Sequence, residues 1–331
     1  AAQQDRLWQL MAGRERYEAA EHEQTPEVAD QEAIYQPAFY VLREPGMMAV
    51  AGQQIMAIGH FLKIADIQEN DRVLEYGAGY GQTALAFARM GARVHTVDIN
   101  PMFCRAVRAQ AAFFLVRLQA FVGAFGDNPR GRQYKLIFFY EAFHHCRDFF
   151  AVIGRLREHL TPDGKILLGG EPITTNPKDP SIPYAWGMRL DAENAAVVRH
   201  RGWYELGFQE SFLVQCFIRQ GFSWRKHPCE ASPFAIIHEF RLRTAVIELA
   251  TEHLAPSDAD SWHGMEPEPL GRWTRARSTL TLDTHQAVQR LSLWIVNHHP
   301  SAIEVTFTLG AVTEQHTFKP RERLEVFISG P

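Results

Sequence analysis

The most constraining feature of this sequence is a glycine-rich turn that follows a short apolar run. Run and turn read VLEYGAGYG over residues 73–81, and a helical pattern begins just after them, near Gln82. Alternate glycines let the backbone turn tightly and approach a ligand that any Cβ would block. The start of the following helix adds free N–H groups and the positive end of the helix dipole. Together these features predict a nucleotide-binding α/β domain.

From residue 72 onward, short apolar runs alternate with segments of helical periodicity. Strands that alternate with helices are typical of βαβ units, which build a parallel sheet through right-handed crossovers. The pattern predicts five strands and three intervening helices. The strands are Arg72–Tyr76, Arg93–Val97, Ala120–Ala124, Leu136–Phe139 and Lys165–Gly169, and the helices are Thr83–Met90, Met102–Phe114 and Phe149–His159.

Segments of a different character flank this core. Helices are predicted at Gln4–Ala20 and Met47–Ile64, which makes residues 1–65 an N-terminal helical cap. The core domain is predicted to span residues 66–255, with a substrate insertion near 176–210 introduced by a Pro-rich stretch. Later elements of this domain are predicted as helices at Ala192–Arg201 and Ser211–Gln220 and a strand at Phe234–Glu248.

The last part of the chain, residues 266–331, has the texture of a small all-β domain. Its apolar runs are short and separated by turns, which predicts a β-sandwich. The predicted strands are Ser278–Leu282, Leu291–Val296, Ala302–Leu309, Glu314–Phe318 and Leu324–Ile328.

Acidic residues after successive strands indicate which nucleotide the turn binds. A dinucleotide fingerprint needs a third glycine where this chain has Gln82, so a pyrophosphate is poorly matched. A zwitterionic amino-acid cofactor instead needs an acid near its ammonium group, which Glu75 offers. Asp98, at the tip of the second strand, suits both ribose hydroxyls. After the third strand, Asp127 could accept the adenine amino group while Phe125 packs on the ring.

These motifs resemble, in their order, those of the class I methyltransferases that use S-adenosylmethionine (SAM). The resemblance covers residues 50–172 and includes the turn, Asp98, the Phe125–Asp127 loop and the LTPDGK sequence at 160–165. The chain departs from the family pattern at Ala124, where the third-strand acid often stands, and in its Pro162-Asp163-Gly164 turn. The resemblance implies a Rossmann-like seven-stranded sheet with SAM across the carboxyl ends of its strands. The predicted cofactor-binding residues are Glu75, Gly77, Gly79, Gly81, Asp98, Phe125, Asp127 and Tyr140.

The fourth strand runs into the sequence YEAFHHC at residues 140–146, where the methyl group is expected. An alcohol acceptor loses a proton on methylation, so a nearby base helps. We predict His145 as the base, with His144 close behind it, and a structural or capping role for the pair remains an alternative. Glu141 is expected to orient a histidine or bind substrate hydroxyls. No metal site is predicted, because sequence neighbours rarely converge on one ion.

Residues on the acceptor side follow the fifth strand. Glu171 could bind acceptor hydroxyls or act as a base, and a capping role is an equal alternative. Tyr184 and Trp186 offer flat apolar faces and Arg189 offers directional hydrogen bonds, which suits a sugar. Packed aromatic rings and a surface ion pair are the competing interpretation.

The C-terminal β domain is similar to small β-sandwiches appended to bacterial enzymes of surface-glycan assembly, which favours a sugar acceptor. A packing or dimerisation module is the alternative. We therefore predict O-methylation of a sugar, nucleotide-linked sugar or glycan. The rival functions are N-methylation of an amino sugar or small molecule, a non-catalytic SAM- or glycan-binding protein, and an NAD-dependent sugar oxidoreductase.

Composition narrows the partners and the compartment. The formal net charge of −4 predicts neither nucleic acid nor an anionic membrane as a partner. The four cysteines are far apart in sequence, which indicates reduced thiols. No run is long enough for a membrane helix, and the first residues lack the apolar core of a signal peptide. We therefore expect a cytoplasmic enzyme with a small-molecule or glycan acceptor, and a homo-oligomer is left open.

Overall fold

A computed structural model describes residues 2–23, 45–242, 262–266, 271–274, 290–296, 301–309, 312–320 and 322–329. The chain forms two compact units, Ala1–Leu242 and Arg243–Pro331. The predicted strand Ser278–Leu282 and the end of the predicted strand Phe234–Glu248 lie outside the described residues.

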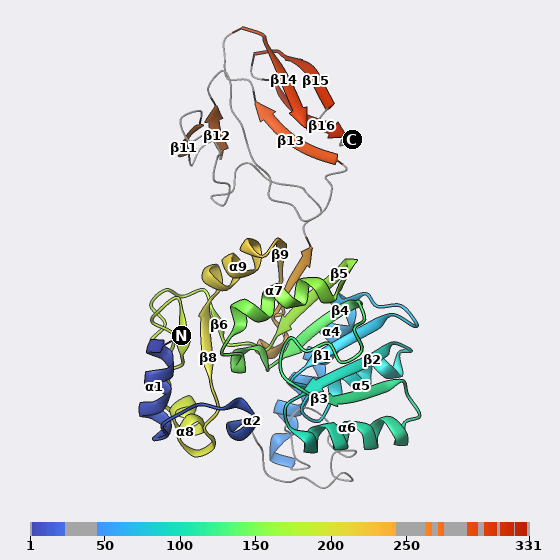
Figure 1. The fold of residues 1–331 in the computed structure, drawn as a ribbon, viewed down its shortest axis with the longest axis vertical. Coiled ribbons are helices and arrows are strands. Elements are labelled where there is room, and N and C mark those ends of the chain that lie inside the picture. The colour runs from blue at the N-terminus through green and yellow to red at the C-terminus, as the bar shows by residue number, and fades with distance from the viewer. Residues whose placement is uncertain are drawn as a thin grey trace. The chain divides into compact units, whose positions relative to one another are not determined.

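A seven-stranded mixed sheet with the order β3-β2-β1-β4-β5-β10-β9 forms the centre of the first unit (Figure 1). The first five strands in this order run parallel, and β10 is antiparallel to both of its neighbours, β5 and β9. This architecture confirms the predicted Rossmann-like sheet. Its strands are β1 (Arg72–Tyr76), β2 (Arg93–Asp98), β3 (Leu118–Val122), β4 (Tyr134–Tyr140), β5 (Leu160–Gly169), β9 (Phe222–His227) and β10 (Ile237–Leu242).

Helices cover both faces of this sheet, which is why its central strands are apolar without interruption. Along β4, Phe138 packs into a cluster with Phe61 and Phe87 on one face, whereas Phe139 packs with Leu156 on the other. The helices are α4 (Met48–Ala65), α5 (Gln82–Arg89), α6 (Pro101–Phe113), α7 (Phe149–His159) and α9 (Glu210–Arg219), and a short turn of helix, η3 (Pro233–Ala235), precedes β10.

The chain changes direction across the sheet between β1 and β4, which are parallel neighbours. In open α/β sheets, ligands bind outside the carboxyl ends of the strands at such a point. The glycine-rich turn follows β1, and the short helix η2 (Phe143–His145) follows β4. The fold therefore brings the two predicted chemical motifs to one edge.

The N-terminal segment differs from the single predicted helix Gln4–Ala20. Helix α1 (Ala2–Ala12) ends at Gly13, whose positive φ of 65° stops the helix, and α2 (Ala19–His22) follows. A 3-10 turn, η1 (Pro45–Met47), precedes α4. The helix α1 packs on the insertion after β5, where the Trp8 indole donates to the Gly202 carbonyl at 3.1 Å.

This insertion has strands that the sequence did not indicate. They form the three-stranded sheet β6-β8-β7, and one helix connects two of them. The elements are β6 (Ile173–Thr174), β7 (Trp186–Met188), α8 (Ala192–Arg201) and β8 (Leu206–Gln209).

The second unit contains three antiparallel strand pairs among its described residues. They confirm a small C-terminal β unit, and the pair β11–β12 was not predicted. The strands are β11 (Trp262–Glu266), β12 (Gly271–Thr274), β13 (Arg290–Val296), β14 (Ile303–Leu309), β15 (Val312–Phe318) and β16 (Arg323–Ser329). None of the described helices in either unit has the length and apolar character needed to cross a bilayer.

Candidate active site at the carboxyl ends of the strands

The turn after β1 requires glycine at two positions. Gly77 has a φ of +66°, and a Cβ there would lie 2.6 Å from the Ala142 Cβ. Gly81 has a φ of +74°, and its Cβ would lie 2.7 Å from a Val107 methyl group. Both contacts are too short for carbon atoms, and both backbone conformations disfavour other residues. Because Ala142 precedes the histidine pair by two residues, the turn lies directly against the end of β4.

Two buried carboxylates lie beside this turn. Glu75 is 3% exposed and accepts a hydrogen bond from the Ala84 N–H at 3.1 Å. Burial raises the pKa of Glu75 well above its usual range. Asp98 accepts hydrogen bonds from the N–H groups of Gly79 at 3.0 Å and Asn100 at 2.8 Å. Burial, opposed by these bonds, raises the pKa of Asp98 to about 6.

These groups fit a cofactor that carries both an ammonium group and a ribose. A cation beside Glu75 would offset the cost of burying its negative charge. Asp98 is already fixed by the backbone of the turn, so its oxygens are oriented for ribose hydroxyls. A dinucleotide, the alternative weighed from the sequence, would offer no ammonium group to Glu75. Glu75 is a buried acid within the strand itself.

The other predicted cofactor residues have different surroundings. Phe125 lies against the turn, with a ring atom 3.3 Å from the Cβ position of Gly77. Asp127 is exposed, and its carboxylate accepts from the Ala124 N–H at 2.8 Å, within its own turn. Tyr140 is buried in the core, with its ring edge-on to Phe61. The roles of all three toward a cofactor stay predictions.

Glu171 holds the histidine-containing turn η2. One of its oxygens accepts from the N–H groups of Ala142 at 2.9 Å and Phe143 at 2.8 Å. Its other oxygen contacts the His144 N–H at 3.0 Å and His144 Nδ1 at 2.8 Å. Burial opposes ionisation, but the bonds from His144 and from the backbone lower the pKa of Glu171. Four hydrogen bonds therefore give Glu171 a positioning role, which corresponds to the capping alternative.

The two histidines differ in charge because their neighbours differ. Burial lowers the pKa of His144, but the bond to Glu171 and the charge of Glu205 outweigh burial and raise it to about 9. For His145, burial and the adjacent positive His144 lower the pKa to about 4. Their ring centroids lie 4.2 Å apart. The surroundings thus favour the charged form of His144, held by Glu171, and the neutral form of His145.

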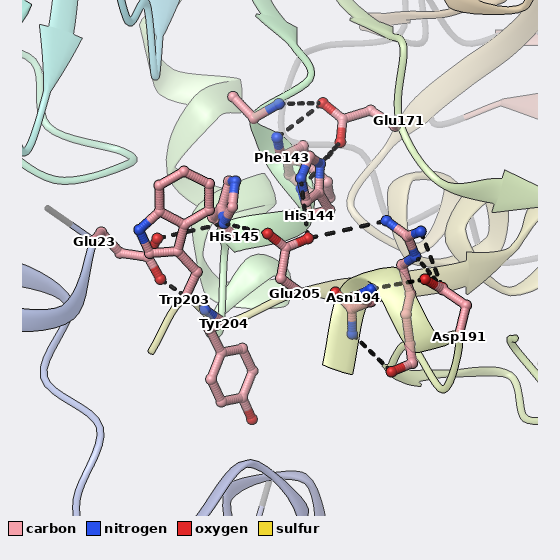
Figure 2. Close-up of polar contacts among 12 residues, drawn as sticks. Glu23, Phe143, His144, His145, Glu171, Asp191, Asn194, Trp203, Tyr204 and Glu205 are labelled. Carbon is pink, nitrogen blue, oxygen red and sulfur yellow. Dashed lines mark hydrogen bonds and ion pairs between the residues drawn. The ribbon is translucent and has the colours of Figure 1, made fainter. Parts of the chain in front are cut away.

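Two further carboxylates, which no sequence pattern indicated, face the histidines (Figure 2). Glu205 approaches His144 Nε2 at 3.6 Å and His145 Nδ1 at 3.9 Å. Glu23 approaches His145 Nδ1 at 3.4 Å and accepts from the Tyr17 hydroxyl at 2.7 Å. Burial, opposed by hydrogen bonds to its carboxylate, raises the pKa of Glu23 to about 8.

Arg189 also lies beside this cluster, and its contact with an acceptor stays a prediction. Its guanidinium lies 4.0 Å from Glu205 and makes two contacts of 3.0 Å with Asp191. Asp191 also caps α8 by accepting from the Asn194 N–H at 2.8 Å. The arginine is therefore both oriented and half-buried beside the histidines.

Glu141 begins the segment between β4 and η2 in a strained conformation. Its φ is +49°, and its N–H donates to the Gly169 carbonyl at 2.9 Å. Burial raises the pKa of Glu141 to about 7, with Glu171 adding to the shift and His144 opposing it. A carboxyl group with this pKa can exchange a proton near neutral pH.

The predicted aromatic acceptor residues are engaged within the protein. The Tyr184 hydroxyl donates to the Met188 carbonyl. The Trp186 ring lies edge-on to Phe149 at 5.1 Å and is stacked on Phe212 at 6.4 Å. Both correspond to the packed-aromatic alternative, and their contact with an acceptor stays a prediction.

Residues 74–166 match the family model described as a methyltransferase domain. The matched residues include the turn, both buried acids and the histidine pair. The match confirms the predicted enzyme class, a SAM-dependent methyltransferase, and SAM as its cofactor. No curated protein matches the sequence.

Solved methyltransferase structures are similar to the chain at low sequence identity. The TehB-like SAM-dependent methyltransferase of Corynebacterium glutamicum is 15% identical with a TM-score of 0.41, over 59% of this chain and 92% of that one. The glycopeptide N-methyltransferase MtfA complexed with SAM is 16% identical with a TM-score of 0.44, over 57% and 93%. The CcbJ methyltransferase of Streptomyces caelestis is 16% identical with a TM-score of 0.41, over 56% and 89%.

Proposed function

We propose that the protein transfers the methyl group of SAM to a hydroxyl oxygen of a small polyhydroxylated acceptor, such as a sugar. One observation supports this above all: the polar cluster around His144 and His145 follows directly after Ala142, which packs on Gly77 of the turn. A molecule bound to the cluster would therefore lie next to a cofactor bound to the turn, and proximity is a large part of methyl-transfer catalysis.

In this proposal, the chain binds SAM through two acids with separate tasks. Glu75 receives the ammonium group, which neutralises its buried charge. Asp98 receives the ribose hydroxyls, held in place by the Gly79 and Asn100 N–H groups. Bound SAM supplies an electrophilic methyl group on its sulfonium, and the turn keeps the reacting groups close and shielded from water.

The acceptor side supplies directional hydrogen bonds and a base. Arg189 and Glu205 offer a donor and an acceptor for hydroxyl groups. We assign proton removal to Glu141, because its pKa of about 7 suits a base better than the protonated His144 or the weakly basic His145. This differs from the sequence-based preference for His145.

The resemblance of residues 266–331 to β-sandwiches of surface-glycan enzymes supports a sugar in particular. The competing acceptor is an amine, which the buried carboxylates of Glu23 and Glu205 favour because they attract a positive charge. Incubation with SAM and a panel of sugars, nucleotide-linked sugars, amino sugars and small amines would test both, with S-adenosylhomocysteine measured as product. NMR of the methylated product identifies the atom. Methyl transfer to amines alone would overturn the O-methylation proposal, and SAM binding without any turnover would favour a binding protein.

A further inference from the structure

We propose that His144, His145 and Glu205 form a binding site for a divalent transition-metal ion, with Zn²⁺ as the best fit and Glu23 beside it. This goes beyond methyl transfer, which by itself needs no metal. Figure 2 shows these three side chains and Glu23 converging from three separate segments of the chain. Donor atoms of His144, His145 and Glu205 all lie within 4.8 Å of one another.

The distances between donor atoms fit tetrahedral coordination. Bonds of about 2.0–2.1 Å from Zn²⁺ to nitrogen or oxygen place neighbouring tetrahedral ligands about 3.3 Å apart. The corresponding separations are 3.6 Å from His144 Nε2 to Glu205 and 3.4 Å from His145 Nδ1 to Glu23. The third, from His145 Nδ1 to Glu205, is 3.9 Å. Small side-chain movements would bring His144, His145 and Glu205 onto one ion, which leaves its fourth position open beside Glu23.

The ligand types indicate which ion binds. Imidazole nitrogen suits zinc, iron, nickel and copper, whereas Mg²⁺ and Ca²⁺ prefer an all-oxygen site. Two imidazoles with carboxylates are typical of zinc and ferrous sites. The filled d shell of Zn²⁺ imposes no preferred coordination geometry. Zinc therefore tolerates the unequal distances between donor atoms seen here.

A support behind His144 resembles that of metal-binding histidines. Such histidines almost always donate their second ring nitrogen to a carboxylate or carbonyl, which fixes the tautomer and the ring orientation. His144 Nδ1 contacts Glu171 at 2.8 Å, which leaves Nε2 directed toward Glu205. Three backbone N–H groups hold Glu171 in turn. His144 is thus fixed in the orientation that a ligand needs, and a bound cation would displace the proton from Nε2.

His145 supplies an independent observation. Its Nδ1 is buried and has no hydrogen-bond partner among the described residues. The nearest charged groups are carboxylate oxygens of Glu23 and Glu205, which are themselves acceptors. A buried ring nitrogen without a hydrogen-bond partner is unfavourable, because unpaired buried polar groups cost free energy. A metal cation between these atoms would bind the lone pair and the carboxylates together.

The charge balance points the same way. The side chains of Glu23, Glu171 and Glu205 are 12%, 1% and 8% exposed, so three carboxylates are buried in one cluster. Arg189, at 4.0 Å from Glu205, also pairs with Asp191. Buried charges are normally paired or bound to metals. Because Glu171 already pairs with His144, a divalent cation would compensate Glu205 and Glu23.

A metal ion here would also act on the acceptor, and this consequence rests on the proposed function. Bound Zn²⁺ lowers the pKa of water from about 15.7 to about 7, and an alcohol bound to the same ion is affected similarly. The ion would therefore assist Glu141 by making an acceptor hydroxyl easier to deprotonate.

The test measures metal binding directly on the full-length protein. Protein stripped with a chelator is titrated with Zn²⁺ by calorimetry and with Co²⁺ by absorption spectroscopy. We expect one ion per chain and the strong visible bands of tetrahedral Co²⁺. We expect His145→Ala and Glu205→Gln to weaken binding more than about 100-fold. Glu171→Gln should weaken it about 10–100-fold, as second-layer partners do. His200→Ala, at an exposed position of α8, is the matched control and should bind like the wild type.

The outcomes separate this proposal from the proposed function. Absence of a one-to-one ion in the wild-type protein, or equal binding by His145→Ala, would overturn the metal site. Circular dichroism of each variant excludes loss of fold as the cause. SAM binding is titrated in the same metal-free protein: retained SAM binding and turnover without metal binding refute only the metal site. Metal binding without methyl transfer to any acceptor refutes only the proposed reaction.

Discussion

An alanine at position 77 would bring a methyl group into the contact between the glycine-rich turn and the end of β4. Its Cβ would lie 2.6 Å from the Ala142 Cβ, with Phe125 at 3.3 Å on another side. The φ of +66° costs about 1–2 kcal/mol for a residue with a Cβ. Overpacking against a buried neighbour adds about 1–3 kcal/mol. We therefore expect Gly77→Ala to lower the free energy of unfolding by about 2–5 kcal/mol.

Urea unfolding of the variant and the wild type measures this difference, and calorimetric titration with SAM reports on the turn itself. Because relief of the contact must move the turn away from Ala142, we expect SAM affinity to fall at least about tenfold. Gly59→Ala is the matched control. Gly59 is exposed in α4 with no atom within 4 Å of its Cβ position, so alanine there should stabilise the protein by about 0.5–1 kcal/mol. Near-wild-type stability and SAM affinity in Gly77→Ala would refute the reasoning.

Three other predictions follow from the charged groups. The pKa of Asp98 is raised to about 6, and ribose hydroxyls need its ionised form, so SAM affinity should fall as the pH drops below about 6. Asp98→Asn should remove this pH dependence when SAM binding is measured by calorimetry. A variant with the same pH profile as the wild type would contradict the assignment. Glu141→Gln should lower kcat about 10²–10⁴-fold with little change in SAM affinity, and wild-type kcat would exclude Glu141 as the base. The bidentate contact with Arg147 lowers the pKa of Asp5. The stabilisation from this ion pair is therefore present above about pH 4 and is lost as the pH falls further. Asp5→Asn should then cost about 1 kcal/mol in urea unfolding at pH 7 and much less at pH 3, and an equal cost at both would argue against it.

The core of the fold was predictable because its signals are local. The strands β1, β2 and β4 are apolar runs, and the helix α7 coincides with its predicted bounds, Phe149–His159. The break at Gly13 and the short strands β6 and β7 were missed. A lone glycine within a helical pattern is often tolerated, and strands of two or three residues have too few positions to show a period.

The site was predictable only in part, for a related reason. Glu75 lies near the end of β1, Asp98 ends β2 and the histidine pair follows β4, so the topology alone brings them to one edge. Glu23 and Glu205 reach the same place through the docking of α1 and α2 on the insertion, which no local pattern encodes. Glu171 was predicted at the correct edge of the sheet. Its hydrogen-bond partners could not be predicted, because the four nitrogen atoms around it depend on how η2 folds back.

Glu23 reaches the site from a segment that no strand of the central sheet holds in position. The two acids proposed to bind the cofactor, Glu75 and Asp98, lie in one contiguous stretch, whereas the proposed acceptor side combines residues near 23, 141–145 and 171–205. Selection can therefore alter the segments of the acceptor side while the stretch proposed to bind the nucleoside stays unchanged. A chain organised in this way can acquire new acceptors by substitution at its periphery, and relatives that share the turn are free to diverge in what they modify.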